Sequence, residues 1–226
     1  MIALLAGATG LVGQSLLNQL LADPRYTQVH CIGRRIPDVQ HTKLHTHIVD
    51  FANLPMSSPG LPTADDVYIA LGTTIKVAGS QAAFRAIDFD SVLAVAHMNN
   101  AQAATKSIAS LTSKRIGIVS AMGADAQSAV FYSRVKGEME AAVAKLGYTS
   151  TVFARPSMLA GNREALSQAT RPGEQIGLAL MRPFKWLIPT NYHVIEASQV
   201  AKALIHLVTH AAPGVQVALS GELQKI

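Results

Sequence analysis

Cysteine is almost absent from the 226-residue chain, which contains Cys31 alone. A single thiol excludes a disulfide framework within the chain, and no pairing of cysteine with histidine has zinc-site spacing. Charged residues are also scarce, at 15% against roughly 25% in an average globular protein. Because apolar residues make up 49% of the chain, intrinsic disorder is excluded and a folded domain with a large core is expected.

Long apolar runs are absent as well. None reaches the roughly 18 to 20 residues that a membrane-spanning helix needs, so no membrane partner is expected. The first residues, Met1 to Gly7, lack the basic region of a secretory signal peptide and run directly into a glycine motif. The sequence therefore predicts a cytoplasmic protein. Its length fits one domain over residues 1–226.

A modest excess of basic residues gives the chain a formal net charge of +5 and a pI near 9.5. The basic residues are scattered, and their longest runs are pairs, Arg34-Arg35 and Lys114-Arg115. Aromatic residues make up only 5% and do not alternate with basic ones, so a stacking platform for nucleic acid is missing. An anionic small ligand explains the modest basic excess equally well, so we expect a small-molecule partner and no nucleic acid.

Two hydrophobic periods alternate along the chain. Short apolar runs, typical of strands buried on both faces, are separated by segments with helical spacing. This order predicts an α/β fold, a doubly wound parallel sheet of the Rossmann type. Strands are expected at 2–6, 28–32, 44–49, 67–71, 115–119, 149–154 and 215–219, and helices at 11–21, 80–109 in two pieces, 129–146 and 197–209.

The pattern breaks down over residues 157–195, where proline and glycine interrupt it repeatedly. This stretch predicts a small C-terminal substrate lobe at about 157–195 rather than a second domain. Met181, Phe184 and Trp186 fit either the wall of a substrate pocket or a small core beneath a loop.

A glycine-rich turn joins the first predicted strand to the first predicted helix. Its three glycines suit a tight turn, close approach of a pyrophosphate, and close packing of helix on strand. Free N–H groups and the helix dipole at such a turn favour an anion. The sequence therefore predicts a dinucleotide site at Gly7, Thr9, Gly10, Leu11, Val12 and Gly13, with the spacing G-x-x-G-x-x-G.

The end of the second predicted strand indicates which nicotinamide cofactor binds. An acidic residue there would bond the ribose 2′-hydroxyl of NAD, whereas arginine accepts the 2′-phosphate of NADP. Here Arg34 and Arg35 follow Gly33, and no acid is present. We therefore expect NADP(H), with a pair of solvated surface arginines as the alternative reading.

Tyr132 and Lys136 are four residues apart on a predicted helix and share one face of it. A cation beside a phenol favours the phenolate, so Lys136 would bring the pKa of Tyr132 closer to neutral pH. Ser120 follows the preceding strand and is predicted to hold a substrate carbonyl while Tyr132 exchanges a proton. Together Ser120, Tyr132 and Lys136 are the predicted catalytic residues.

These motifs in this order resemble the short-chain dehydrogenase/reductase superfamily, and its atypical branch in particular. Several stretches resemble the Tat-interacting-protein-like NAD(P)H-binding oxidoreductases within that branch. The resemblance covers nearly the whole chain. It is carried by Leu71-Gly72-Thr73-Thr74, by residues 131–138 around the tyrosine and lysine, by Arg155-Pro156-Ser157, and by Arg171-Pro172-Gly173-Glu174.

The resemblance implies further cofactor contacts. Asp50 and Phe51 would face the adenine, and Leu71, Gly72, Thr73 and Thr74 would line the ribose and pyrophosphate. Pro156, Ser157 and Met158 would pack near the nicotinamide amide. The chain departs from relatives at Ala121, where a second serine is common. Ser120 is thereby left as the sole serine candidate.

Other features of the sequence point to no metal. His206 and His210 have ligand spacing on a helix but no acidic partner, and His45 and His47 suit a solvated or partly buried strand face. The predicted function is that of an NADPH-dependent oxidoreductase acting on a small carbonyl or quinone-like substrate. The alternatives are an NADPH-binding regulatory or scaffold protein without turnover, and other chemistry on this fold, such as epimerisation or dehydration. The oligomeric state stays open.

Overall fold

A computed structural model describes residues 1–54, 60–104, 114–160 and 190–226. Its centre is a seven-stranded sheet in the order β3-β2-β1-β4-β5-β6-β9, and every neighbouring pair is parallel. This order confirms the predicted doubly wound fold. The strands are β1 (Ile2–Ala6), β2 (Gln28–Gly33), β3 (Leu44–Ile48), β4 (Asp66–Ile69), β5 (Arg115–Val119), β6 (Ser150–Arg155) and β9 (Gly214–Leu219).

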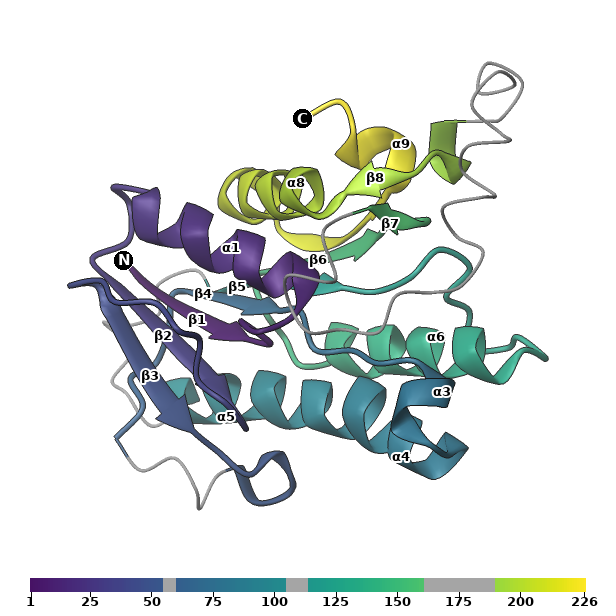
Figure 1. The fold of residues 1–226 in the computed structure, drawn as a ribbon, viewed down its shortest axis with the longest axis horizontal. Coiled ribbons are helices and arrows are strands. Elements are labelled where there is room, and N and C mark those ends of the chain that lie inside the picture. The colour runs from purple at the N-terminus through teal and green to yellow at the C-terminus, as the bar shows by residue number, and fades with distance from the viewer. Residues whose placement is uncertain (55–59, 105–113, 161–189) are drawn as a thin grey trace.

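Helices cover both faces of the sheet (Figure 1). On one face lie α1 (Leu11–Ala22) and α8 (Ala197–His210), which pack against each other. On the other face lie α5 (Val92–Ala104) and α6 (Phe131–Ala144), with the short α3 (Ile75–Ala78) and α4 (Gln81–Arg85) at one end. The last short helix, α9 (Ser220–Leu223), follows β9.

Strand β1 shows why this sequence forms a central strand. Ala3 and Leu5 point into the core under α1 and α8, while Leu4 and Ala6 point into the core under α5 and α6. All four are buried, so a continuous apolar run fits a strand covered on both sides. Burial of a leucine is worth about 1.5–3 kcal/mol, which fixes the strand between the two helical layers.

The helical stretch predicted in two pieces from residue 80 contains a change of helix type that the sequence did not predict. A π-helical turn, η2 (Ala86–Ser91), separates α4 from α5. Thr74 and Ser80 accept hydrogen bonds from the first turns of α3 and α4, and Gly79 ends α3 with a left-handed φ of 84°. The spacing of hydrophobic residues in the sequence does not predict such a change of helical pitch.

The predicted substrate lobe lies largely outside the described residues, as do Met181, Phe184 and Trp186. At its borders, the two-residue strands β7 (Leu159–Ala160) and β8 (Ile195–Glu196) pair with each other in a separate small sheet. Among the described helices, none combines the length and apolar character that crossing a bilayer requires.

Candidate nucleotide and catalytic site

The glycine turn places the start of α1 at the carboxyl edge of the sheet. Gly7 has a φ of 92°, and a Cβ there would lie 2.6 Å from the carbonyl carbon of Ala70. A Cβ on Gly13 would lie 1.9 Å from the Gly7 oxygen. Both positions therefore require glycine for packing alone. At Gly10 a Cβ would meet only ordinary contacts, the nearest at 3.4 Å.

The first turn of α1 has the properties of an anion site. Gly10 is the N-cap residue and supplies no side-chain cap, and no acidic residue lies in the first turn. Within the described residues, the N–H groups of Leu11, Val12 and Gly13 have no hydrogen-bond acceptor. Three free donors at the positive end of a twelve-residue helix fit a pyrophosphate.

A cleft runs from this turn to the end of β2. It is lined by Gly7, Ala8, Thr9, Ile32, Gly33, Arg34, Arg35, Phe51 and Leu71. Both arginine side chains are exposed, and neither has an ion-pair partner among the described residues. The cleft therefore joins an anion-binding helix terminus, two guanidinium groups without ion-pair partners in the described part of the chain and an aromatic ring, which suits the adenosine half of a nicotinamide dinucleotide.

Asp50 has a local role beside this cleft. Its carboxylate accepts hydrogen bonds from the side-chain amide of Asn53 at 2.7 Å and from the Ala52 N–H at 3.0 Å. These bonds hold the pKa of the Asp50 carboxyl below its usual value. Asp50 thus caps the 3-10 helix η1 (Phe51–Asn53), whose first residue lines the cleft.

The loop after β4 connects the cleft to the catalytic helix. Leu71 lines the cleft, the Thr73 N–H donates to Asp88 Oδ2 at 2.9 Å, and Thr74 caps α3. A Cβ on Gly72 would lie 3.3 Å from Asp88 Oδ1 and 3.8 Å from Lys136 Nζ. Glycine at this position leaves room for a buried charge pair directly behind the loop.

Helix α6 carries the predicted tyrosine and lysine at successive turns. The Tyr132 ring is partly exposed and packs on Phe84, with ring centroids 5.3 Å apart. Its hydroxyl has no hydrogen-bond partner within the described residues. Lys136 is 3% exposed, and its Nζ lies 2.7 Å from Asp88 Oδ1. The contact is an ion pair, since the two groups carry opposite charges at this distance.

The structure gives Ser120 a partner that the sequence did not predict. Its buried hydroxyl donates to Glu140 Oε1 at 2.5 Å, and the same carboxylate is held by Arg155 at 2.6 and 3.0 Å. Glu140 lies eight residues after Tyr132, which is about 12 Å further along the helix. Ser120 therefore ties β5 to α6, and this contact argues against its predicted role in holding a substrate carbonyl.

The segment after β6 is fixed mainly through its backbone. The Pro156 carbonyl accepts from the Met122 N–H at 3.1 Å. The Ser157 hydroxyl donates to the His193 carbonyl at 2.5 Å, and the Ser157 N–H donates to Ser220 Oγ at 2.8 Å. Met158 is 44% exposed. Its side chain remains available for the predicted contact with the nicotinamide end of a cofactor.

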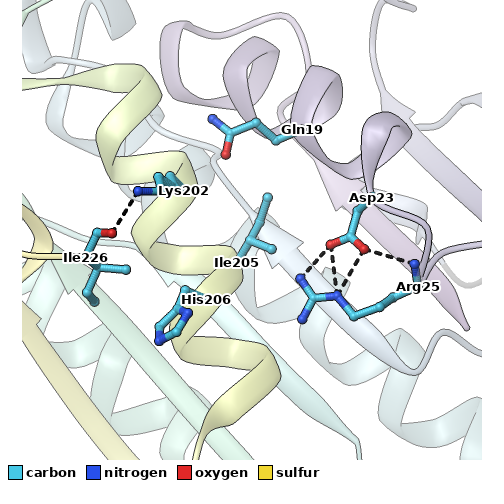
Figure 2. A pocket seen from close by; sticks show the side chains of 7 residues that line it. All are labelled: Gln19, Asp23, Arg25, Lys202, Ile205, His206 and Ile226. Atoms are coloured by element: carbon cyan, nitrogen blue, oxygen red, sulfur yellow. Dashed lines mark hydrogen bonds and ion pairs between the residues drawn. The ribbon is translucent and has the colours of Figure 1, made fainter.

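A second groove, of about 270 Å³, lies between α1 and α8 (Figure 2). It is at the C-terminal end of α1, about 18 Å of helix away from the glycine turn. Its charged side chains are paired within the groove, Asp23 with Arg25 and Lys202 with the Ile226 carbonyl. This groove is therefore separate from the nucleotide cleft.

Sequence reasoning missed Asp88, Glu140 and Arg155, the charged residues that hold α6. Asp88 and Glu140 are buried and Arg155 is partly buried. The sequence offers one indication of the two carboxylates: an acidic residue within an apolar segment is expected to be buried and then needs a charged or hydrogen-bonding partner. Cys31 lies in the core, and burial raises the pKa of its thiol to about 12.

The histidine pairs form contacts with each other. His30 Nδ1 lies 3.0 Å from His47 Nε2, and the His30 ring also stacks on His45. The rings of His206 and His210 stack with centroids 4.3 Å apart. In the part of the chain that the structure describes, no group of three or more His, Cys, Asp or Glu side chains is arranged to hold a metal ion.

No protein-family model matches the chain. Protein fmp52, mitochondrial, of Emericella nidulans is 34% identical over 178 residues, which cover 76% of this chain and 71% of the relative. Protein HTATIP2 of Rattus norvegicus is 30% identical over 206 residues, covering 88% and 78%. These two proteins agree with the resemblance drawn from the motifs.

Solved structures show the same fold at lower identity. A short-chain dehydrogenase/reductase family oxidoreductase from Burkholderia thailandensis has a TM-score of 0.67 at 16% identity, covering 100% of this chain and 93% of its own. The human epimerase family protein SDR39U1, solved with NADPH, has a TM-score of 0.60 at 18% identity, covering 97% and 74%.

The cytoplasmic location predicted from the first residues is wrong on this comparison, because the Fmp52 relatives are named as mitochondrial. The absence of a basic start gives no positive information about where a protein resides. Location is read by receptors from signals that composition does not capture.

Proposed function

Because the chain belongs to the HTATIP2 and Fmp52 family of atypical short-chain dehydrogenase/reductases, we propose that it is an NADPH-dependent oxidoreductase for a small carbonyl or quinone-like substrate. When bound, the nicotinamide supplies or accepts the hydride. The protein's part is to hold the dinucleotide, exchange a proton and exclude water. Several described residues fit these tasks.

The observation that carries the proposal is the pairing of two features at one edge of the sheet. The uncapped start of α1 follows β1, and the Tyr132 and Lys136 turn of α6 follows β5. In an open parallel sheet, ligands bind beyond the carboxyl ends of the strands. The loop at Gly72 and Thr73 lies against the Asp88–Lys136 pair and so connects the two features.

Tyr132 is the proposed proton donor for carbonyl reduction. Its hydroxyl is not engaged by a described residue, and Lys136 lies one turn further along the same helix. A positive charge at that position stabilises the phenolate that remains after the proton leaves. In the proposed site Lys136 also bonds the nicotinamide ribose. Ser120 is left out of the proposed chemistry because Glu140 holds its hydroxyl.

NADP preference is proposed from Arg34 and Arg35. Each is exposed at the cleft, and each charge-assisted bond to a 2′-phosphate contributes roughly 1.5–3 kcal/mol. Replacement of both with Ala is therefore expected to weaken NADPH binding at least tenfold and to leave NADH binding within about twofold. Calorimetric titration with each nucleotide measures the difference. An equal loss of affinity for NADPH and NADH would contradict the proposal that Arg34 and Arg35 bind the 2′-phosphate.

A cofactor-linked role without turnover is the second candidate, and the occupied Ser120 hydroxyl favours it. With Ala121 in the next position, neither residue directly after β5 offers a free hydroxyl for a substrate carbonyl. Such a protein would bind NADPH through the same cleft. Its output would be a partner interaction rather than a product.

Turnover separates the two candidates. The purified protein is expected to oxidise NADPH with some members of a panel of quinones and aldehydes, and Tyr132→Phe is expected to lower that rate at least a hundredfold while NADPH still binds. Tyr148→Phe is the matched control, because its hydroxyl bonds the Ala96 carbonyl at 2.8 Å in the core. A Tyr132→Phe variant with an undiminished rate would overturn the proposed chemistry. NADPH binding without oxidation across the panel would favour the second candidate.

A further inference from the structure

Asp88 is a fully buried carboxylate that the proposed function does not use. It lies in the π-helical turn η2 and faces two different parts of the site. Oδ1 is 2.7 Å from Lys136 Nζ on α6, and Oδ2 accepts from the Thr73 N–H on the loop after β4. One carboxylate thus joins the proposed cofactor loop to the proposed catalytic helix.

The local helix geometry supports a dedicated role. A π-helical turn is rare within an α-helix and occurs frequently at functional sites. Here it coincides with the one acidic residue of the segment that is buried, since Asp90 two positions later is exposed. Gly72 leaves space for the Asp88 carboxylate, because a Cβ there would lie 3.3 Å from Oδ1, although its distance of 3.8 Å from Lys136 Nζ would be an ordinary contact.

Lys136 needs a counterion where it lies. An ammonium group that is 3% exposed has lost most of its hydration, and its burial is unfavourable unless an anion compensates that loss. The other carboxylates on α6 are engaged elsewhere: Glu138 with Arg85, and Glu140 with Arg155. Among the described residues, Asp88 is therefore the anion that faces Lys136.

We propose that Asp88 is a positioning residue that keeps Lys136 protonated and fixed against the cofactor loop, so that its charge is present at the site across the physiological pH range. The use of the Lys136 charge in cofactor binding and proton exchange rests on the proposed function. The ion pair that maintains this charge does not. Burial raises the pKa of the Asp88 carboxyl, and Lys136 and the Thr73 N–H oppose this. The carboxylate and the ammonium therefore each stabilise the charged form of the other.

The first test is the pH dependence of stability without any cofactor. Asp88→Asn keeps the shape and removes the charge, so the folded variant must bury the Lys136 ammonium without its counterion. This cost applies to the charged amine and is absent from the unfolded chain, so it shrinks at alkaline pH, where the amine becomes neutral. We expect the loss of stability in Asp88→Asn, measured by urea unfolding, to be largest at pH 6 and to decrease by pH 9.5. Asp90→Asn is the matched control and should show no such trend.

The second test uses NADPH itself as the probe. Fluorescence titration with NADPH is carried out from pH 7 to pH 9.5. For wild type and for Asp90→Asn, the dissociation constant is expected to change by no more than about threefold over this range. Asp88→Asn should bind NADPH about as tightly as wild type at pH 7 and at least tenfold more weakly than wild type at pH 9.5, as Lys136 loses its proton. A purely structural role would weaken binding by the same factor at every pH, and that result would overturn the proposal.

A third variant covers the case in which Asp88→Asn does not fold. Asp88→Asn with Lys136→Met removes both charges, and replacing a whole buried pair costs far less stability than breaking it. We expect the double variant to fold and unfold at a higher urea concentration than Asp88→Asn. A double variant no more stable than the single one would count against the pairing. Absence of NADPH binding in wild type would reject the proposed function and leave the stability test of Asp88 intact.

Discussion

Individual side chains in this protein divide between those free for a ligand and those committed to the fold. Tyr132, Arg34 and Arg35 have no hydrogen-bond or ion-pair partner in the described part of the chain, which suits groups that await a cofactor or substrate. Ser120 differs, because its hydroxyl is buried and bonded to Glu140. A residue type in the expected position is therefore insufficient evidence for a role, since the hydrogen bond it already makes decides its availability.

Ser120→Ala tests this distinction at the level of one hydroxyl. Because the Glu140 carboxylate keeps its two bonds to Arg155, we expect a loss of about 1–2 kcal/mol in the free energy of unfolding. NADPH oxidation with a quinone substrate should stay within about threefold of wild type. Denaturant unfolding and steady-state rates measure the two quantities. A rate loss as large as that of Tyr132→Phe, in a variant of near-native stability, would restore the serine to the catalytic site.

At the scale of elements, helix α6 is held by ion pairs on three of its residues. Lys136 pairs with Asp88 in η2, Glu138 with Arg85 in α4, and Glu140 with Arg155 at the end of β6. Helix α1 is held differently, through the contact of Gly13 with the Gly7 backbone. Side-chain charges thus fix the helix that carries the proposed chemistry, whereas close backbone packing fixes the helix that binds the proposed anion.

The glycine turn offers a matched pair of substitutions. Gly13→Ala would place a Cβ 1.9 Å from the Gly7 oxygen, so we expect loss of several kcal/mol or failure to fold. Gly10→Ala meets its nearest atom at 3.4 Å and should fold with a normal circular dichroism spectrum. Its methyl group would occupy the approach of the pyrophosphate, and we expect NADPH affinity to fall at least tenfold. Undiminished affinity in Gly10→Ala would contradict the placement of the pyrophosphate.

At the scale of the whole molecule, the layered fold follows from local patterns, whereas much of the site does not. Apolar runs such as Ile2–Ala6 require burial on both faces, and their alternation with helical segments predicts the parallel sheet. Tyr132 and Lys136 were predictable because four-residue spacing on a helix is local. The partner of Ser120 was not, since Glu140 is 20 positions away and meets it only when α6 packs behind β5.

The free energy of unfolding of the protein is expected to fall at acidic pH because His30 is buried. Burial, with His45 and His47 nearby, lowers the pKa of His30 to about 4, whereas an unfolded histidine titrates near 6.5. The unfolded state therefore binds the extra proton first, and stability falls as pH drops from about 6.5 to 4, by on the order of 2–3 kcal/mol. Urea unfolding at pH 7.5 and pH 4.5 measures the fall. His30→Gln should reduce it, while an unchanged pH dependence in that variant would assign the effect to other groups.

The pairing of β6 with β9 joins residues 150–155 to residues 214–219, and β9 forms one border of the sheet. During synthesis from the amino end, β6 must wait for roughly 60 further residues before its neighbour exists, which at about 5–20 residues per second takes several seconds. Through that interval the backbone of β6 is an open template for strands of other chains. Newly made copies of this protein are thus exposed to aggregation late in translation, and a holdase that shields β6 would raise the yield of folded protein.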